Sequence, residues 1–527
     1  MEAIEKSPVP VVLEIPLSRY PGMNRFALEY VQGAGTAHRF LPRAELRSLR
    51  PHRVSSRPDL AEALIESNAA WGNDASEAVR RWQEAETIVL VAGQQVGFGG
   101  GPMYTLSKIT SLLAMRRDFE SEGIPCTVFF WLATEDHDFD EVATLTLPSP
   151  EGAVTISAGE RNSIRGVVGN MAVPDSLRRK FLEHVKIEPR PGWIHPGLSF
   201  RDSFGRLISE VFHGDQVILV DSLLKPLRRA GSRLFHQLID SAAKLSRKVT
   251  QRSAELEASG YKPQVVARDG TLPFLFLIAE NGERLSLREE DGMWLAGAHP
   301  IGLERLHEIV DREPERISTG VLTRPLLQDA VLQPSIFVGG PAEVAYYAQI
   351  APLHEELKIS LPRVALRGHT LIVPERVLQT YHRFGLQEDD IFSGPDEIVA
   401  RLEPEIDRQL SEAMARARQV IDNELSAIRD LVLPADKSLG KSIERSLSRI
   451  RYQVGRLEER GKRSILRRNR ERFEAIRKFS ANLFPGGIPQ DRIIAWIEYW
   501  FRYGRRLVRR MTEETQPDSD RVRIIGL

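Results

Sequence analysis

The spacing of apolar residues changes near residue 394, and this change separates two kinds of structure along the chain. Before it, short apolar runs alternate with longer amphipathic stretches, a pattern typical of parallel strands that alternate with helices. After it, apolar residues recur every three or four positions over many turns, which predicts long amphipathic helices. We therefore expect a core over residues 1–393, a helical hairpin over 394–480 and a helical segment over 481–527 that returns to the core.

The first part contains short apolar runs that we interpret as buried strands, at Thr87–Ala92, Cys126–Ala133, Gln216–Val220 and Ser335–Val338. Helices are expected at Pro102–Arg117, Pro226–Leu245 and Ala342–Leu357. Leu272–Ile278 can form a further strand, and its proline favours an edge position. The alternation predicts an α/β fold with a doubly wound, mainly parallel sheet. Residues 145–205 and 255–320 fit it poorly, and we interpret them as inserted connecting segments with smaller strands.

The second part contains two series of apolar residues with helical spacing, joined by a short break at Leu433–Asp436. The first series is Ile398, Leu402, Ile406, Leu410, Val420, Leu425 and Ile428. The second is Leu439, Ile443, Leu447, Ile450, Val454 and Leu457, in a helix that continues to Phe479. Together they predict an antiparallel α-helical coiled coil. Because a lone hairpin is not expected to cover all its apolar surface, we expect docking or dimerisation through this coiled coil.

The composition of the chain limits which classes of partner and which cellular location we expect. Its 527 residues include 72 basic and 72 acidic side chains, so no global charge favours nucleic acid or a membrane surface. A single cysteine, Cys126, excludes an intramolecular disulfide. The N-terminus lacks the basic-then-apolar order of a secretion signal, and no apolar run reaches about 18 residues. We expect a cytoplasmic protein with no membrane partner.

Local charge is strongest in the segment Lys441–Lys478, which holds 14 basic and 5 acidic residues. Such a helix can bind nucleic acid, or it can be the solvated face of a coiled coil. The second interpretation is favoured because Tyr452 and Phe473 are the only aromatic residues available for base stacking.

Three unusual clusters fall where predicted strands end, at Gly93–Pro102, Thr134–Asp138 and Gly339–Glu343. Ligands of doubly wound sheets bind outside the carboxyl ends of the strands. The coincidence of three clusters at this edge therefore predicts a binding site there.

The first cluster is a glycine-rich loop before a helix, with uncovered amides that suit a phosphate or carboxylate. Its candidate binding residues, with a lysine on the following helix, are Gln94, Gln95, Gly97, Gly101, Pro102 and Lys108. The loop is neither a P-loop nor a dinucleotide fingerprint. The alternative is a tight turn that only packs the helix on the strand.

The second cluster is acidic at five of the seven positions from Glu135 to Glu141. His137 beside Asp136 and Asp138 can act in acid–base chemistry, and Glu135 is a candidate binding residue. The alternative is an acidic helix N-terminus stabilised by the helix dipole. No tightly bound metal is expected, because Cys126 and His137 are the only soft zinc ligands nearby.

The third cluster combines a planar cation with carboxylates and glycines. Arg324 suits a phosphate or carboxylate. Glu343 is expected in the first turn of a helix, where the alternative is that its carboxylate only caps the helix. The further candidates are Gln328, Asp329, Gly339, Gly340, Glu343 and Tyr346.

Together the motifs resemble the bacillithiol biosynthesis cysteine-adding enzymes. The resemblance extends over essentially the whole chain and lies in Ala92–Lys108, Phe129–Val142, Thr323–Gln349 and Leu483–Arg492. It implies a Rossmann-like core similar to class I aminoacyl-tRNA synthetases and a coiled coil that pairs two protomers. It also implies a ligase that joins the carboxylate of cysteine to the amine of glucosaminyl malate in the last step of bacillithiol biosynthesis, with ATP and Mg²⁺ activating the carboxylate.

The site roles follow as a hypothesis. Amides of Gly97–Gly101, with Lys108 and Arg324, would bind an anion. His137, held by Asp136 or Asp138, would accept the amine proton or position the amine. The sequence lacks the His-Ile-Gly-His-type and Lys-Met-Ser-Lys-Ser-type motifs that bind ATP in class I synthetases. Two alternatives stay open: a class I-like nucleotidyltransferase acting on another acid, and a non-catalytic coiled-coil scaffold that binds nucleic acid.

Overall fold

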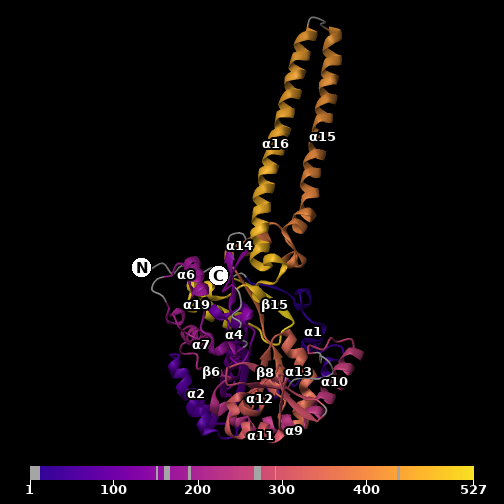
Figure 1. Cartoon of the computed structure of the whole chain (residues 1–527). Coiled ribbons are helices and arrows are strands. Elements are labelled where there is room, and N and C mark those ends of the chain that lie inside the picture. Colours follow the sequence, from indigo (N-terminus) through magenta and orange to yellow (C-terminus); the bar gives the residue numbers. More distant parts are fainter. Residues whose placement is uncertain are drawn as a thin grey trace. The chain divides into compact units, whose positions relative to one another are not determined.

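The computed structural model describes residues 12–149, 152–159, 166–187, 191–265, 274–290, 292–435 and 439–527, with the backbone alone at 400, 402–411, 435, 458–459 and 461–469. The chain forms two compact units. The first comprises residues 1–149, 153–372 and 488–527, and the second comprises residues 150–152 and 373–487. Figure 1 shows both units, and each is described by itself below.

The first unit is built around a five-stranded parallel sheet with the order β13-β12-β2-β3-β6. Its strands are β2 (Ile88–Gln94), β3 (Cys126–Leu132), β6 (Val217–Asp221), β12 (Ile336–Gly339) and β13 (Arg363–Leu366). The four apolar runs selected from the sequence all lie in this sheet, because strands buried on both faces need continuous apolar residues.

Helices cover both faces of this sheet, so the predicted doubly wound fold is confirmed. Phe130 of β3 belongs to the core shared with α4 (Met103–Ser121). Its neighbour Phe129 points to the other face and packs on Trp82 of α3 (Ser76–Glu84), with ring centroids 5.2 Å apart. On the same face as Phe129, α13 (Pro341–Leu357) packs against β12 and β13. The period of two along each strand divides its residues between the two layers.

Two smaller sheets lie in the segments that did not fit the alternation. One is two-stranded, from β4 (Thr144–Ser149) and β5 (Gly152–Ser157). The other has the order β10-β9-β8-β7-β11 and antiparallel pairing. Its strands are β7 (Leu275–Ile278), β8 (Arg284–Glu290), β9 (Met293–Ala296), β10 (His299–Ile301) and β11 (Ile317–Thr319).

Two predictions about elements were wrong. The edge position expected for Leu272–Ile278 fails, because β7 lies between β8 and β11; Leu272 and Pro273 lie outside the described residues. The single helix expected at Pro226–Leu245 is three helices: α8 (Lys225–Ala230), α9 (Ser232–Asp240) and α10 (Ala242–Ala258). The first break is at Gly231, where a Cβ would overlap the side chain of Leu327.

The remaining helices of the first unit are α1 (Arg25–Gln32), α2 (Pro58–Ala70), α5 (Phe139–Val142), α6 (Asp175–Val185), α7 (Phe200–Val211), α11 (Leu303–Arg312), α12 (Arg324–Leu332), α17 (Gln490–Ile493), α18 (Ile497–Tyr503) and α19 (Arg505–Glu514). The C-terminal segment also contains a strand, β15 (Arg521–Gly526), which pairs with β1 (Val12–Pro16). In the three-stranded sheet, β15 lies between β1 and β14 (His369–Val373).

The second unit contains α14 (Glu375–Arg383) and a hairpin of two long helices, α15 (Pro395–Ala435) and α16 (Gly440–Leu483). Figure 1 shows the two helices side by side. The pairing is antiparallel, because Arg451 lies 2.9 Å from Asp422 across the hairpin. The coiled coil expected from the sequence is thus confirmed, although the side chains of Leu402, Ile406 and Leu410 lie outside the described residues.

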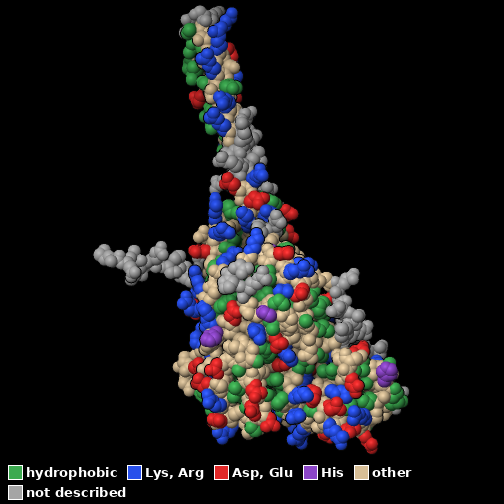
Figure 2. Space-filling model, turned by 60° about the vertical axis from the view of Figure 1, so that its left-hand side comes forward, with side chains coloured by type: hydrophobic (Ala, Val, Ile, Leu, Met, Phe, Trp, Pro, Cys, Tyr) green, Lys and Arg blue, Asp and Glu red, His purple; other side chains and the backbone are tan. Residues whose placement is uncertain are grey.

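The hairpin leaves much of its apolar surface open. Large apolar side chains are exposed at Val420, Ile428, Leu431, Leu439, Ile450, Tyr452 and Leu457. In Figure 2, hydrophobic and basic side chains alternate toward the tip of the hairpin. None of the helices in the described part of the chain has the length and hydropathy needed to cross a bilayer.

Candidate functional site

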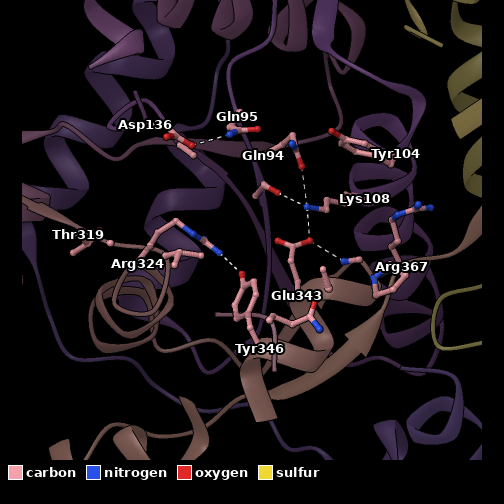
Figure 3. Close-up of a pocket in the computed structure, with 18 of the residues that line it drawn as sticks. Gln94, Gln95, Tyr104, Lys108, Asp136, Thr319, Arg324, Glu343, Tyr346 and Arg367 are labelled. Carbon is pink, nitrogen blue, oxygen red and sulfur yellow. Dashed lines mark hydrogen bonds and ion pairs between the residues drawn. The ribbon is translucent and has the colours of Figure 1, made fainter. Parts of the chain in front are cut away.

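A cavity of about 640 Å³ opens in the first unit, next to the carboxyl ends of β2, β3 and β12. Its walls also include residues of the antiparallel insertion, of the N-terminal segment and of the C-terminal segment. Figure 3 shows the side chains that point into it. Ten residues selected from the sequence line this cavity: Gln94, Gln95, Lys108, Glu135, Asp136, His137, Arg324, Gly340, Glu343 and Tyr346.

Glu135 follows β3, and both oxygens of its carboxylate accept hydrogen bonds. It accepts hydrogen bonds from Arg228 (2.7 Å), from Ser318 (2.9 Å), and from the amide and hydroxyl of Thr319 (2.9 and 2.8 Å). Burial by itself would raise the pKa of Glu135, but Arg228, Arg284 and the Thr319 amide outweigh it and hold the pKa below its ordinary value. Glu135 therefore stays ionised and fastens β11 of the insertion to the end of β3.

Asp136 and His137 form the polar rim beside Glu135. Asp136 accepts hydrogen bonds from the Gln95 side chain and from the His137 amide, both at 2.7 Å. Burial is the largest single influence and raises the pKa of Asp136, but the His137 side chain, the Gln95 side chain and the His137 amide together outweigh it. The pKa of Asp136 is therefore lowered, and the group is a carboxylate. The His137 Nδ1 atom lies 3.3 Å from Asp136 Oδ1 and 3.0 Å from Arg284 Nη1.

Those two contacts of His137 require different hydrogen positions on Nδ1. A guanidinium only donates, so the contact with Arg284 requires an unprotonated Nδ1. A bond to the carboxylate of Asp136 requires a proton on the same atom. Proton uptake at Nδ1 would therefore exchange Arg284 for Asp136 as the partner of the ring.

Lys108 and Glu343 meet deep in the cavity. The buried Lys108 ammonium donates to Gly93 O (2.8 Å) and Gln94 Oε1 (2.9 Å), and it lies 2.6 Å from Glu343 Oε2. Three acceptors use all three N–H bonds of the ammonium, so Lys108 fixes its neighbours and has no donor left for an anion. Glu343 also accepts from the Gly340 amide at 2.7 Å, the usual contact of a glutamate in the first turn of a helix.

Arg324 begins α12 and reaches into the same corner. Its guanidinium donates to the Tyr346 hydroxyl at 2.6 Å and to Gln328 at 3.2 Å. Burial alone would lower the pKa of Arg324, but the electrostatic effect of Tyr346 and Glu343 outweighs it and raises the pKa. Two of five N–H groups are used in these bonds, so Arg324 can still bind a carboxylate or phosphate.

The start of the glycine-rich loop, Gly93 to Gln95, lines the cavity, whereas the glycines expected to cradle an anion lie outside the lining. Gly97, Gly101 and Pro102 do not line it, and both glycines are buried. A Cβ at Gly100 would overlap the Trp496 ring, whose Nε1 donates to Gly100 O at 3.0 Å. At Gly100 the missing side chain therefore permits close packing under Trp496.

Four other selected residues also lie outside the cavity lining. Asp138 caps α5 by accepting from the Glu141 amide at 3.1 Å. Gln328 and Asp329 are buried, and Asp329 binds His354 at 2.9 Å. Gly339 leaves room for the Glu343 side chain, since a Cβ there would lie 2.8 Å from Glu343 Cβ. These four residues therefore contribute to the structure around the cavity and not to its lining.

Several cavity residues were not predicted: Tyr20, Tyr104, Phe276, Arg284, Arg367 and Arg492. Arg284 lies on β8 and is bound to Thr319 O at 2.7 Å, with its guanidinium 3.7 Å from the centroid of the Phe276 ring. Arg367 follows β13 and pairs with the buried Asp491 at 2.8 Å. These residues come from segments far apart in the chain, and only tertiary packing brings them together.

Comparison with known proteins identifies the family to which this architecture belongs. The model for the N-terminal Rossmann-like domain of bacillithiol biosynthesis BshC matches residues 23–368, and the model for its C-terminal coiled-coil domain matches residues 370–527. The chain belongs to the BshC family of bacillithiol biosynthesis.

Relatives of BshC type match over nearly the whole chain. A protein of Koribacter versatilis is 27% identical over 94% of this chain and 96% of its own length. A protein of Symbiobacterium thermophilum is 29% identical over 88% of each chain, and one of Bacillus cereus strain Q1 is 27% identical over 87% and 88%. Each of these relatives carries the name "Putative cysteine ligase BshC".

Proposed function

We propose that this BshC-family chain is a ligase that joins the carboxylate of cysteine to the amine of glucosaminyl malate, in the last step of bacillithiol biosynthesis. The observation that carries the proposal is the cavity beside β2, β3 and β12, where carboxylates and guanidinium groups face one another. Amide formation between a carboxylate and an ammonium needs both kinds of group, to hold the reactants and to accept a proton. The names of the relatives agree with this chemistry.

ATP with Mg²⁺ is the proposed source of activation, because a carboxylate needs a leaving group before an amine can displace it. The residues present fit a polyphosphate: Arg284, Arg367 and Arg492 line the cavity, and guanidinium groups bind phosphate oxygens through paired N–H bonds. In this proposal the arginines replace both the glycine-rich loop and Lys108 as the anion-binding groups.

His137 is the proposed base for the amine of glucosaminyl malate. With Nδ1 free of Arg284, the ring accepts the proton, and Nδ1–H then donates to Asp136, which is held ionised by Gln95 and the His137 amide. Asp136 thereby stabilises the imidazolium that forms. Asp138 takes no part, because its side chain caps α5.

We further propose a cytoplasmic homodimer formed through the hairpin. Exposed apolar residues on both helices, including Val420, Leu431 and Leu457, would be covered by a second copy. In such a dimer the basic residues of Lys441–Lys478 would form the solvated polar face of the coiled coil.

The test is a synthesis assay with purified protein, cysteine, glucosaminyl malate and ATP-Mg²⁺, in which each component is omitted in turn. The product is trapped with a thiol-reactive tag and identified by mass. We expect bacillithiol from the complete mixture alone. Product formed without ATP would overturn the activation step. If folded protein binds cysteine but forms no product, the assignment of glucosaminyl malate as the acceptor is overturned.

A further inference from the structure

The three carboxylates that line the cavity differ in how many of their oxygen atoms are engaged. Glu135 has donors on both oxygens. Asp136 has the Gln95 side chain on one oxygen and the His137 amide on the other. Glu343 is different, since Lys108 Nζ (2.6 Å) and the Gly340 amide (2.7 Å) both approach Oε2. Within the described part of the chain, Glu343 Oε1 receives no hydrogen bond.

The free oxygen has a fixed position. Lys108 is itself held by Gly93 and Gln94, so the ion pair anchors Glu343 to the end of β2 as well as to its own helix. The Glu343 side chain is 19% exposed, and that exposure is toward the cavity. In Figure 3 the second oxygen of Glu343 points away from Lys108, toward the space between Gln94 and Arg324. A fixed carboxylate oxygen without a donor suits an N–H group of a ligand.

The neighbouring wall offers the opposite charge. Arg324 points into the same space from α12 and retains N–H groups beyond those bound to Tyr346 and Gln328. An anion acceptor and a guanidinium side by side complement a small zwitterion, whose ammonium and carboxylate are separated by one carbon atom. We propose that Glu343 Oε1 binds the α-ammonium of the amino-acid substrate while Arg324 faces its carboxylate.

This inference rests on the proposed cysteine ligase reaction, which involves two amines with opposite requirements. The amine of glucosaminyl malate must lose a proton to attack, and the proposed base for it, His137, lies on the loop after β3. The α-amine of cysteine must stay protonated and out of the reaction. An anchored carboxylate suits that second task, and it favours binding of α-amino acids over thiols that lack an ammonium group.

The test compares two ligands on the same protein. Cysteine and 3-mercaptopropionate share the thiol and the carboxylate, and only cysteine has the ammonium. We expect the wild-type chain to bind cysteine about 10- to 100-fold more tightly, the range of a hydrogen bond between charged groups. In Glu343→Gln the preference should fall below about threefold. Glu304→Gln, which removes the exposed first-turn glutamate of α11, is the matched control and should keep the preference.

The ratio separates a lost contact from a weakened fold, because general damage lowers both affinities together. A variant that weakens both ligands and keeps the preference would overturn the assignment of Glu343. Equal affinity of the wild-type chain for the two ligands would also overturn the assignment. That comparison needs no variant, so it remains possible if the Glu343→Gln protein fails to fold. Wild-type protein that binds no cysteine would overturn the ligase proposal as well, which distinguishes the two failures.

Discussion

Replacing Glu135 with alanine should destabilise the first unit more than any surface change, because Glu135 joins the insertion to the parallel sheet. The change removes four acceptor contacts and leaves Arg228 as a buried cation. The Arg228 side chain is 0% exposed, and its Nε and Nη1 atoms already lack partners in the described residues. Breaking a buried ion pair by removing one partner costs about 3–5 kcal/mol.

Urea unfolding followed by circular dichroism would measure that loss as a shift of the transition of the first unit. The double variant Glu135→Leu, Arg228→Met is the matched control, because it removes both charges and should recover a large part of the stability. A Glu135→Ala protein destabilised by less than about 1 kcal/mol would refute the reasoning, since a loss so small is typical of a surface ion pair.

Three further predictions follow from the site and the hairpin. His137→Ala should lower turnover by at least about a hundredfold in a steady-state assay with an unchanged circular dichroism spectrum, and near-normal turnover would remove the proposed base. The lowered pKa of Glu135 should give a stabilising contribution that is complete above the unfolded pKa of about 4.5 and is lost as pH falls toward the lower folded pKa. Acid unfolding followed by fluorescence should therefore be shallower in Glu135→Gln, and identical acid profiles would contradict the assignment. Leu431→Arg, at a side chain that is 77% exposed, should shift sedimentation toward the monomer with little change in melting temperature, whereas an unchanged sedimentation coefficient would exclude that surface from the dimer contact.

The parallel sheet and the hairpin were predictable because each has a local sequence pattern. Strands buried on both faces require continuous apolar runs such as the one at β3, and coiled-coil helices require three- and four-residue spacing. The antiparallel insertion was expected only as smaller strands. Its strands are short and partly exposed, and a proline before β7 belongs to a segment outside the described residues.

The site was predictable where a residue follows directly from a strand end. Gln95, Asp136 and Glu343 come shortly after the ends of parallel strands, and they line the cavity as that position predicts. Arg284 and Arg367 gave no such signal, since one lies within an insertion strand and the other needs Asp491 from the far end of the chain. The glycine-rich loop is ambiguous from the sequence alone, because glycines allow close packing as well as ligand approach.

The most direct test of the ligase account is transfer of oxygen from cysteine labelled with ¹⁸O in both carboxylate positions. If ATP activates the carboxylate, one labelled oxygen leaves with the phosphorus group when the amine displaces it, and the other stays in the amide. We therefore predict one ¹⁸O in the AMP or phosphate formed for each bacillithiol made, measured by mass spectrometry. Product formation with unlabelled AMP and phosphate would contradict the account.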